Sequence, residues 1–249
     1  MSDDELVEVL DAAVGAVARA LDGVEDTRAV TARPGQYHLD VVADAVAVDV
    51  LVGAGLGVVS EESGVHHPDR DVTVVIDPVD GSTNASRGVP WFATSVCAVD
   101  GDGPRAALVV NQSSGERFQA VRGGGATCDD RPVRTSGCQR LGDAIVAVSG
   151  LPGAHWGWAQ FRALGAAALD LCYVADGRLD GYVALSDGLA PWDYLGALLV
   201  CRESGTEVVD REGRPLVVVD HQVRRAPVAA PPGLLGQLLE VSGRGRDAS

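Results

Sequence analysis

Apolar residues near the start of the chain recur at every third or fourth position, which predicts an amphipathic helix. The residues at this spacing are Leu6, Val9, Leu10, Ala13, Val14, Val17 and Leu21. A loop over 27–37 is expected next, because an Arg-Pro-Gly segment interrupts it. A second helix is expected over 40–51, ending near the glycines at 53 and 55.

The middle of the chain carries apolar runs that are short and bounded by Gly, Pro and Asp, which predicts strands. These runs cover 58–60, 72–76, 93–99, 105–111 and 116–121. The connectors between the last three are short and rich in Gly and Asp, so antiparallel pairing is expected. The glycine run at 123–125 has no apolar helix after it, which favours a hairpin or loop over a nucleotide cradle.

The pattern changes after a polar segment at 131–142, the expected boundary between two halves. Beyond it, strands at 144–149, 179–185 and 226–230 alternate with helices at 166–175, 192–202 and 234–241. Pro191 suits the first position of the middle helix, and a hairpin is expected between 207–210 and 216–219. We expect an N-terminal α+β half at 1–135, a C-terminal α/β half at 136–241 and a flexible tail at 242–249.

Composition narrows the class of protein. No uncharged apolar stretch reaches the ~18 residues of a membrane span, and the acidic start lacks the features of a signal peptide. A cytoplasmic enzyme is therefore expected. The formal net charge of −15 argues against broad contact with nucleic acid or anionic membranes. The chain contains no Lys, which excludes Schiff-base chemistry, and its five scattered cysteines are expected to be reduced thiols.

The candidate chemistry centres on residues 77–84, Asp-Pro-Val-Asp-Gly-Ser-Thr-Asn. Asp77 and Asp80 follow an apolar run and are expected in a turn, where proline stiffens the backbone and glycine permits a tight bend. Two carboxylates beside exposed N–H groups suit a divalent cation that bridges a bound phosphate. Because Asp-Pro and Asp-Gly are common in loops, a plain turn is the alternative. Glu61, after a strand, and Asp193, at a helix start, are the distant acids that favour a site.

These eight residues resemble the D-P-[IVL]-D-G-[TS]-[TS]-N signature of the inositol monophosphatase family. A second stretch at 165–182, with Gly-Ala-Ala-Ala and later Val-Ala-Asp-Gly-Arg-Leu-Asp-Gly-Tyr, is similar to another motif of that family. Most of the chain, as far as Val228, follows the family order. The resemblance implies a layered α-β-α-β-α sandwich of the inositol monophosphatase and fructose-1,6-bisphosphatase type, with the site between two sheet regions.

The resemblance also implies a Mg²⁺-dependent phosphatase that holds two or three ions, with Mn²⁺ as a substitute. Glu61, Asp77 and the Val79 carbonyl would hold the first ion. Asp77, Asp80 and Asp193 would hold the second. Two ions clamp the attacking and leaving oxygens of an in-line displacement and offset the charge on the phosphoryl group.

Each of these acids has a simpler interpretation. Glu61 could be an ordinary surface acid, and Glu62 beside it is expected to be one. Asp193 could merely complement the dipole at the start of its helix.

The expected catalytic residues are Glu61, Asp44 and Ser82. By resemblance, Ser82 and Asp44 hydrogen-bond each other and orient the metal-activated water. A solvated helix acid is the alternative interpretation of Asp44. The backbone N–H groups of Gly81, Ser82 and Thr83 would hold the phosphate oxygens.

Departures from the family pattern fall in the expected substrate pocket. Arg33 lies roughly where the family has Lys, and Ala166 replaces a small hydroxyl residue after Gly165. Ser186 stands where inositol-specific members place Glu, with Asp187 beside it. The set of metal ligands is therefore complete, whereas the polyol pocket is altered.

The sequence thus predicts hydrolysis of a small-molecule phosphate monoester, such as an inositol-phosphate-like, sugar or polyol phosphate. Phosphatases of the same superfamily that act on histidinol phosphate or 3′-phosphoadenosine 5′-phosphate remain alternatives. So do a non-catalytic metal-binding homologue and a metal-stabilised structural module. The expected partner is a small phosphorylated metabolite, without nucleic acid or membrane, and family members commonly form homodimers. Lithium sensitivity is a family trait that we also expect.

Overall fold

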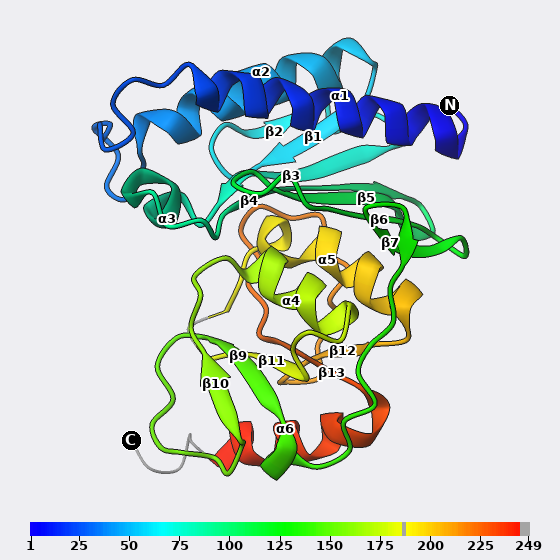
Figure 1. The fold of residues 1–249 in the computed structure, drawn as a ribbon. Coiled ribbons are helices and arrows are strands. Elements are labelled where there is room, and N and C mark those ends of the chain that lie inside the picture. Colours follow the sequence, from blue (N-terminus) through cyan, green and yellow to red (C-terminus); the bar gives the residue numbers. More distant parts are fainter. Residues whose placement is uncertain (186–187, 245–249) are drawn as a thin grey trace.

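The computed structural model describes residues 1–185 and 188–244. Helices and sheets alternate in layers (Figure 1). Helices α1 (Asp3–Asp22) and α2 (His38–Gly53) cover one face of the larger sheet, and α4 (Ala167–Ala175) and α5 (Pro191–Ser204) lie between the two sheets. Helix α6 (Pro232–Arg244) covers the outer face of the smaller sheet. This order confirms the expected α-β-α-β-α sandwich.

The opening helices form for reasons that are visible in the sequence. Ser2 caps α1, where its Oγ accepts the N–H of Glu5 while the Glu5 side chain accepts the N–H of Ser2. The apolar stripe of α1 is buried against α2 and the sheet, at Leu6, Leu10, Ala13, Val14 and Val17. Both helices extend a few residues beyond the predicted bounds at one or both ends.

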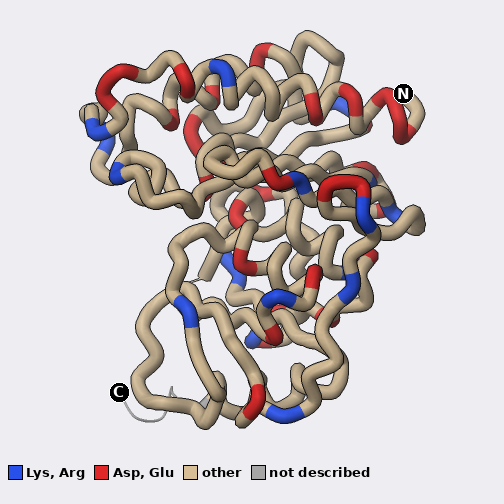
Figure 2. Tube along the Cα trace, viewed as in Figure 1, with Lys and Arg blue, Asp and Glu red and all other residues tan. Residues whose placement is uncertain are grey.

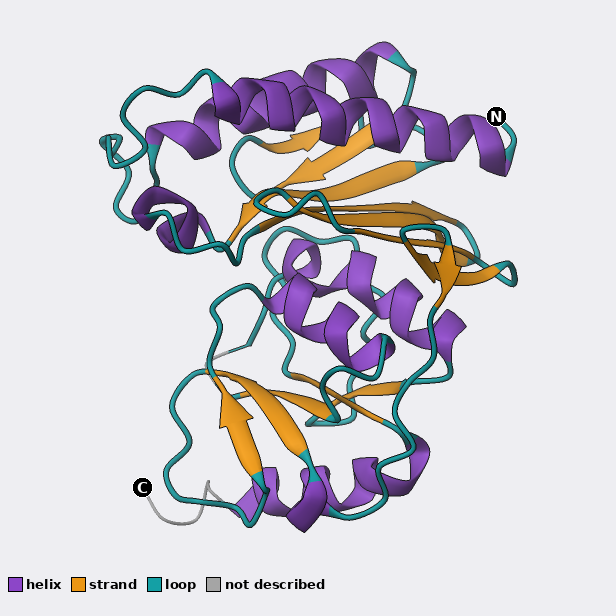
Figure 3. Cartoon of the chain, viewed as in Figure 1, coloured by secondary structure: helices purple, strands orange, loops and turns teal. Residues whose placement is uncertain are grey.

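The larger sheet has eight strands within the described residues, in the order β2-β1-β3-β4-β5-β6-β7-β8. Figure 3 shows strands of this sheet lying between the opening helices and the helices of the central layer. Their bounds are β1 Gly57–Ser60, β2 Gly64–His66, β3 Thr73–Asp80, β4 Ala93–Asp100, β5 Gly103–Asn111, β6 Arg117–Val121, β7 Gly125–Cys128 and β8 Arg131–Pro132. Strands β1 and β3 are parallel, whereas β4, β5 and β6 pair antiparallel as predicted. The glycine run is a hairpin between β6 and β7. The sequence did not indicate β2, β7 or β8, which have only two to four residues each.

The smaller sheet has the order β10-β9-β11-β13-β12 in the described chain. Its strands are β9 Ile145–Ser149, β10 Gln160–Arg162, β11 Gly181–Ala184, β12 Glu207–Asp210 and β13 Pro227–Ala230. The predicted hairpin between 207–210 and 216–219 is wrong, because β12 pairs with β13. Asp210 accepts the N–H of Ala226, which closes β12 onto the later strand. The Leu216 carbonyl instead accepts the Tyr194 hydroxyl, so this segment packs on α5.

The two remaining short helices are α3 (Ser82–Arg87) and a 3-10 turn at Leu141–Asp143. Helix α6 continues through 242–244, which were expected to belong to the tail, and the Ser242 hydroxyl donates to the Leu239 carbonyl. Residues 245–249 of that expected tail lie outside the described residues.

Small side chains allow α5 to pack closely on the larger sheet. A Cβ built at Gly196 would lie 2.7 Å from Ser95 Oγ on β4. Arginine and acidic residues are interspersed along both halves in the view of Figure 2. All five cysteines are free thiols among the described residues. No helix in 1–185 or 188–244 has the length and apolar content to cross a membrane.

Candidate active site

The two motif aspartates lie at the end of β3, on an irregular part of the strand. Asp77 pairs with Ser95 of β4 and Asp80 with Ala93, so two residues of β3 face one residue of β4. In a regular strand, positions three apart point to opposite faces. The extra residue of this bulge returns both aspartates to one side. The expectation that they lie in a turn is therefore wrong, because β3 continues through Asp80.

Both aspartates are buried and held by backbone N–H groups. Asp77 is 2% exposed, and its Oδ1 accepts the N–H of Val79 at 3.0 Å. Asp80 is 8% exposed, and its two oxygens accept the N–H groups of Ala167 at 3.2 Å and Ala168 at 2.7 Å. The Asp80 carboxylate thus lies at the N-terminus of α4, where the helix dipole favours negative charge.

The turn after β3 packs tightly against the start of α4. Gly81 has a φ of 87°, and a Cβ there would lie 3.0 Å from the carbonyl oxygens of Trp91 and Gly165. Only glycine meets both conditions without strain. Helix α3 then begins at Ser82, and Asn84 Nδ2 donates to the carbonyls of Trp91 and Leu164 at 2.8 Å each. These contacts join the motif to the second half of the chain.

Glu61 and Asp193 approach the aspartates from other elements. Glu61 lies in the turn after β1, and its N–H donates to the Ile76 carbonyl of β3 at 3.2 Å. Asp193 lies in the first turn of α5, where its Oδ2 accepts the N–H of Ala190 at 2.7 Å. Asp193 therefore does cap its helix, and it also faces the other three acids.

The four acids form one cluster, because the charge of Asp193 raises the pKa of each of the other three. Burial, followed by the charges of Asp193 and Glu62, raises the pKa of Glu61 to about 8. Burial and then Glu61, Asp80 and Asp193 hold the pKa of Asp77 well above its usual range. Burial and then Asp193 do the same for the pKa of Asp80, and burial raises the pKa of Asp193 to about 6. The fold therefore brings these four residues together, and their role as cation ligands stays a prediction.

This set of donors fits divalent cations. Buried like charges are unfavourable unless they are paired, and none of the four acids belongs to an ion pair with Arg in the described chain. Hard cations bind carboxylate and carbonyl oxygens. In the described chain, no three of the four acids bring ligand atoms within 4.8 Å of one another. Glu116, Cys128 and Asp129, which lie elsewhere, do so.

Within the described chain, no hydrogen bond joins Asp44 to Ser82. Its Oδ1 accepts the hydroxyl of Ser60 on β1 in a buried hydrogen bond, so the predicted Asp44–Ser82 pair is wrong. The reason is the orientation of α2, which turns Asp44 toward β1. The solvated interpretation of Asp44 is also wrong, because the residue is 6% exposed.

Asp40, one turn earlier on α2, is the carboxyl that the sequence did not single out. It is 3% exposed, its Oδ2 accepts the N–H of Tyr37 at 2.8 Å, and Oδ1 has no partner among the described residues. Burial raises the pKa of Asp40 to about 7, and its charge adds to the raised pKa of Glu61. Thr83 and Ser86 on α3 lie near the Tyr37 hydroxyl and lower its pKa. The signal was available, since Asp40 stood at the predicted start of an apolar helix.

Arg33 lies at the edge of the cluster. Its Nη1 contacts Glu62 Oε2 at 3.1 Å, and its side chain is 53% exposed against 9% for Glu62. Gln36 also donates to Glu62. The expectation that Glu62 is an ordinary surface acid is therefore wrong, because this carboxylate fastens the 31–36 loop beside Glu61.

A pocket of about 320 Å³ opens beside Asp80 and Asp193. Its other lining residues are small or apolar: Val148, Ser149, Gly150, Ala163, Gly165, Ala167 and Leu189. Ala166 is 1% exposed at the N-cap of α4 and lies behind this lining. Ser186 and Asp187, which were expected near the substrate, lie outside the described residues.

Comparison with known proteins agrees with this arrangement. The model of the inositol monophosphatase family matches residues 39–242. The chain is 33% identical over 219 residues to an inositol-1-monophosphatase of Mesorhizobium japonicum, covering 79% of this chain and 80% of that protein. It is 36% identical over 194 residues to the Nus factor SuhB of Salmonella typhimurium, covering 71% and 72%.

Among solved structures, the extragenic suppressor protein SuhB of Bartonella henselae superposes with a TM-score of 0.83. The identity is 28%, and the match covers 97% of this chain and 99% of that one. With the family model spanning most of the sequence, the chain belongs to the inositol monophosphatase family.

Proposed function

We propose that the protein is a Mg²⁺-dependent phosphatase that hydrolyses a small phosphate monoester. The observation that carries this proposal is the convergence of Glu61 from the turn after β1, Asp77 and Asp80 from β3, and Asp193 from α5. Asp80 and Asp193 of this set line a pocket. A protein without cations would have no evident use for buried carboxylates that raise one another's pKa.

The residues that would hold the cations follow from this cluster. Glu61, Asp77 and the Val79 carbonyl would hold one ion, and Asp77, Asp80 and Asp193 a second. When bound, divalent cations supply the positive charge that activates a water molecule and stabilises the phosphoryl transition state. Because no three of these described carboxylates bring oxygens within 4.8 Å of one another, cation binding should draw the oxygens closer together.

The remaining residues would bind and orient the substrate. The N–H groups of Gly81, Ser82 and Thr83, at the start of α3, would donate to phosphate oxygens. The leaving group would occupy the pocket beside Asp80 and Asp193.

Asp40 takes the orienting role that the sequence assigned to Asp44. Its unpartnered buried oxygen, its effect on the pKa of Glu61 and the closeness of Tyr37 to α3 all support this placement. With Ser82 it would orient the attacking water and accept a proton. Asp40→Asn should lower kcat with little change in KM, and Asp44→Asn should mainly affect stability.

A panel of phosphomonoesters tests the proposal directly. Inorganic phosphate release should require Mg²⁺, and Asp77→Asn should abolish it while the protein stays folded by circular dichroism. The panel should include inositol, sugar, histidinol and 3′-phosphoadenosine 5′-phosphate esters, because the altered pocket does not identify the leaving group of the substrate. Equal release by the wild type without Mg²⁺, or full activity of Asp77→Asn, would contradict the proposal.

A second candidate function comes from the relatives named Nus factor SuhB, a name that does not denote a hydrolase. A non-catalytic member would bind Mg²⁺ without turnover of any ester in the panel. The complete set of four acids favours the phosphatase, because a binding role alone does not require all of them.

A further inference from the structure

Thr94 lies opposite the bulge that carries the two motif aspartates. It is the single residue of β4 between Ser95 and Ala93, which pair with Asp77 and Asp80. Its side chain is fully buried, and Oγ1 donates to the Pro78 carbonyl at 2.8 Å. A side chain thus takes the place of the backbone donor that a regular ladder would supply to this carbonyl.

Gln112 fixes the direction of that hydroxyl. Its Nε2 donates to Thr94 Oγ1 at 2.8 Å, and its own N–H donates to the Phe92 carbonyl at 3.1 Å at the start of β4. A hydroxyl has one proton to donate and two lone pairs that accept. Because Gln112 occupies an acceptor position, the Thr94 proton is directed to Pro78.

The Pro78 carbonyl belongs to the same planar peptide as the Val79 N–H, so fixing one fixes the other. That N–H donates to Asp77 Oδ1 at 3.0 Å. The result is a continuous relay of hydrogen bonds, from Gln112 through Thr94 and the Pro78–Val79 peptide to the Asp77 carboxylate.

We propose that Thr94 and Gln112 are positioning residues that set the orientation of the Asp77 carboxylate for cation binding. The proposal rests on the proposed function, because it assumes that Asp77 holds a cation. Outer groups that orient ligands typically change metal affinity by about 10- to 100-fold. A group that acts through one peptide plane belongs at the lower end of that range.

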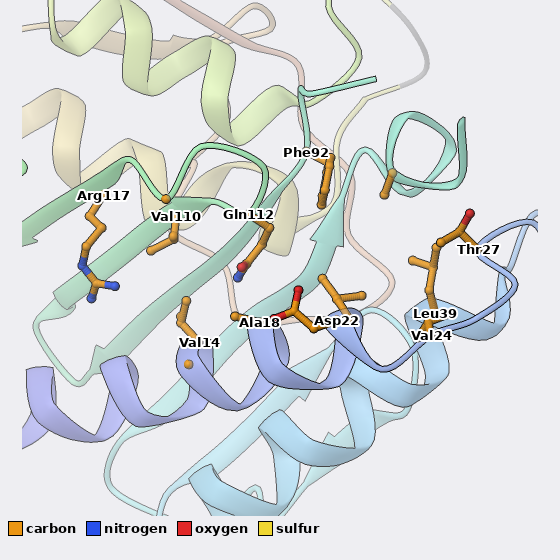
Figure 4. A pocket seen from close by; sticks show the side chains of 14 residues that line it. Val14, Ala18, Asp22, Val24, Thr27, Leu39, Phe92, Val110, Gln112 and Arg117 are labelled. Atoms are coloured by element: carbon orange, nitrogen blue, oxygen red, sulfur yellow. The ribbon is translucent and has the colours of Figure 1, made fainter. Parts of the chain in front are cut away.

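Gln112, at the outer end of this relay, is accessible from a pocket. Gln112 lines a pocket of about 400 Å³ between α1 and the sheet, and Figure 4 shows its amide pointing into the space beside Asp22. Substitution of Gln112 therefore alters the relay without creating a cavity in the core, whereas substitution of Thr94 acts at the buried centre.

The experiment measures Mg²⁺ binding by calorimetry, well below the unfolding temperature, for the wild type and four variants. Thr94→Val keeps the shape but removes the hydroxyl, and Thr94→Ser keeps the hydroxyl. Gln112→Met keeps the length but removes the donor. Thr206→Val is the matched control, because it removes a buried hydroxyl that contacts Ser204 Oγ at the far end of α5, about 17 Å along the helix from Asp193.

We expect Thr94→Val to bind Mg²⁺ about tenfold more weakly, Gln112→Met to lose a smaller factor, and Thr94→Ser and Thr206→Val to match the wild type. kcat at limiting Mg²⁺ should fall in the same order. Wild-type Mg²⁺ affinity in Thr94→Val with only a lower melting temperature would overturn the relay, as would a Thr94→Ser variant as weak as Thr94→Val. If Thr94→Val fails to fold, unchanged Mg²⁺ affinity in Gln112→Met overturns it. Absence of Mg²⁺ binding in the wild type would overturn the proposed function itself, and the relay with it.

Discussion

Individual residues of the site could be predicted where a motif names them. Asp77, Asp80 and Asp193 were identified from their spacing and flanking residues, and the structure brings them together with Glu61. The partner of Asp44 could not be predicted, because the direction of a helical side chain depends on how the helix is rotated against the sheet. One turn separates Asp44 from Asp40, and that turn decides which carboxyl faces Glu61.

A buried acid outside the cluster of Glu61, Asp77, Asp80 and Asp193 gives a prediction about pH. Burial raises the pKa of Asp170 to about 8, although the hydrogen bond from Trp91 Nε1 lowers it, and the unfolded value is about 3.9. The folded state therefore binds more protons between these values, and stability is lost as the pH rises through this window. Asp170→Asn keeps an acceptor for Trp91 and removes the ionisation. In urea unfolding from pH 5 to 9, the variant should gain stability relative to the wild type as pH rises, and a constant difference would contradict the assignment.

Asp210 shows the opposite dependence. Burial alone would raise its pKa, but hydrogen bonds from Arg214 and from the N–H groups of Ala226 and Glu212 hold it well below the usual range. Its stabilising contribution is therefore complete above about pH 4 and is lost as the pH falls toward the depressed value. Asp210→Asn should cost about 2 to 3 kcal/mol at pH 7, as for hydrogen bonds to charged groups. Chemical denaturation should show this difference shrinking at pH 3; a difference that persists unchanged would refute it.

Secondary-structure elements with strong apolar periodicity were predicted well, and short ones were not. Helices α1, α2, α4 and α5 and strands β4 and β5 lie where the patterns placed them. The predicted partner of β12 was wrong, because the nearest apolar run in the sequence packs on α5 through the Tyr194 hydroxyl. Strand β12 pairs instead with β13, where Asp210 accepts the N–H of Ala226. The bulge in β3 could not be read from the sequence either, since it depends on the register with β4.

The contact between α5 and β4 gives a prediction for an element. A methyl group at Gly196 would meet Ser95 Oγ at 2.7 Å and the Val96 carbonyl at 3.3 Å, so Gly196→Ala should cost about 1 to 3 kcal/mol. Ser95→Ala in the same chain should recover part of that loss in a double-mutant cycle. Gly236→Ala on α6 is the control: a Cβ there meets nothing within 4 Å, and alanine favours the helix. Equal effects of the two glycine substitutions in thermal unfolding would rule out a packing origin.

The molecule as a whole is joined across the boundary that composition suggested. The central core combines residues of both halves, and the N–H groups of α4 donate to Asp80 of β3. Arg178, after α4, contacts Glu116 before β6 at 2.8 Å and lies 3.6 Å from the centre of the Tyr173 ring. The division into halves at 1–135 and 136–241 describes the sequence pattern, and whether the halves fold separately is a prediction of its own.

We expect the whole chain to unfold in one cooperative step, because α4 and α5 pack between the two sheets. Tryptophan fluorescence and far-ultraviolet circular dichroism should report the same urea midpoint. Two separate unfolding midpoints would indicate independent halves.

The homodimer expected from the family should appear as twice the chain mass in light scattering.

The proposed phosphatase function depends most on cation binding by the four converging acids. Mg²⁺ titration by calorimetry, comparing the wild type with Asp193→Asn, tests it directly, since asparagine can still accept the N–H of Ala190 and keep the helix cap. We expect the wild type to bind Mg²⁺ and the variant to lose more Mg²⁺ affinity than the about tenfold effect of an outer group. A wild type that binds no Mg²⁺, or an Asp193→Asn variant that binds it equally well, would contradict it.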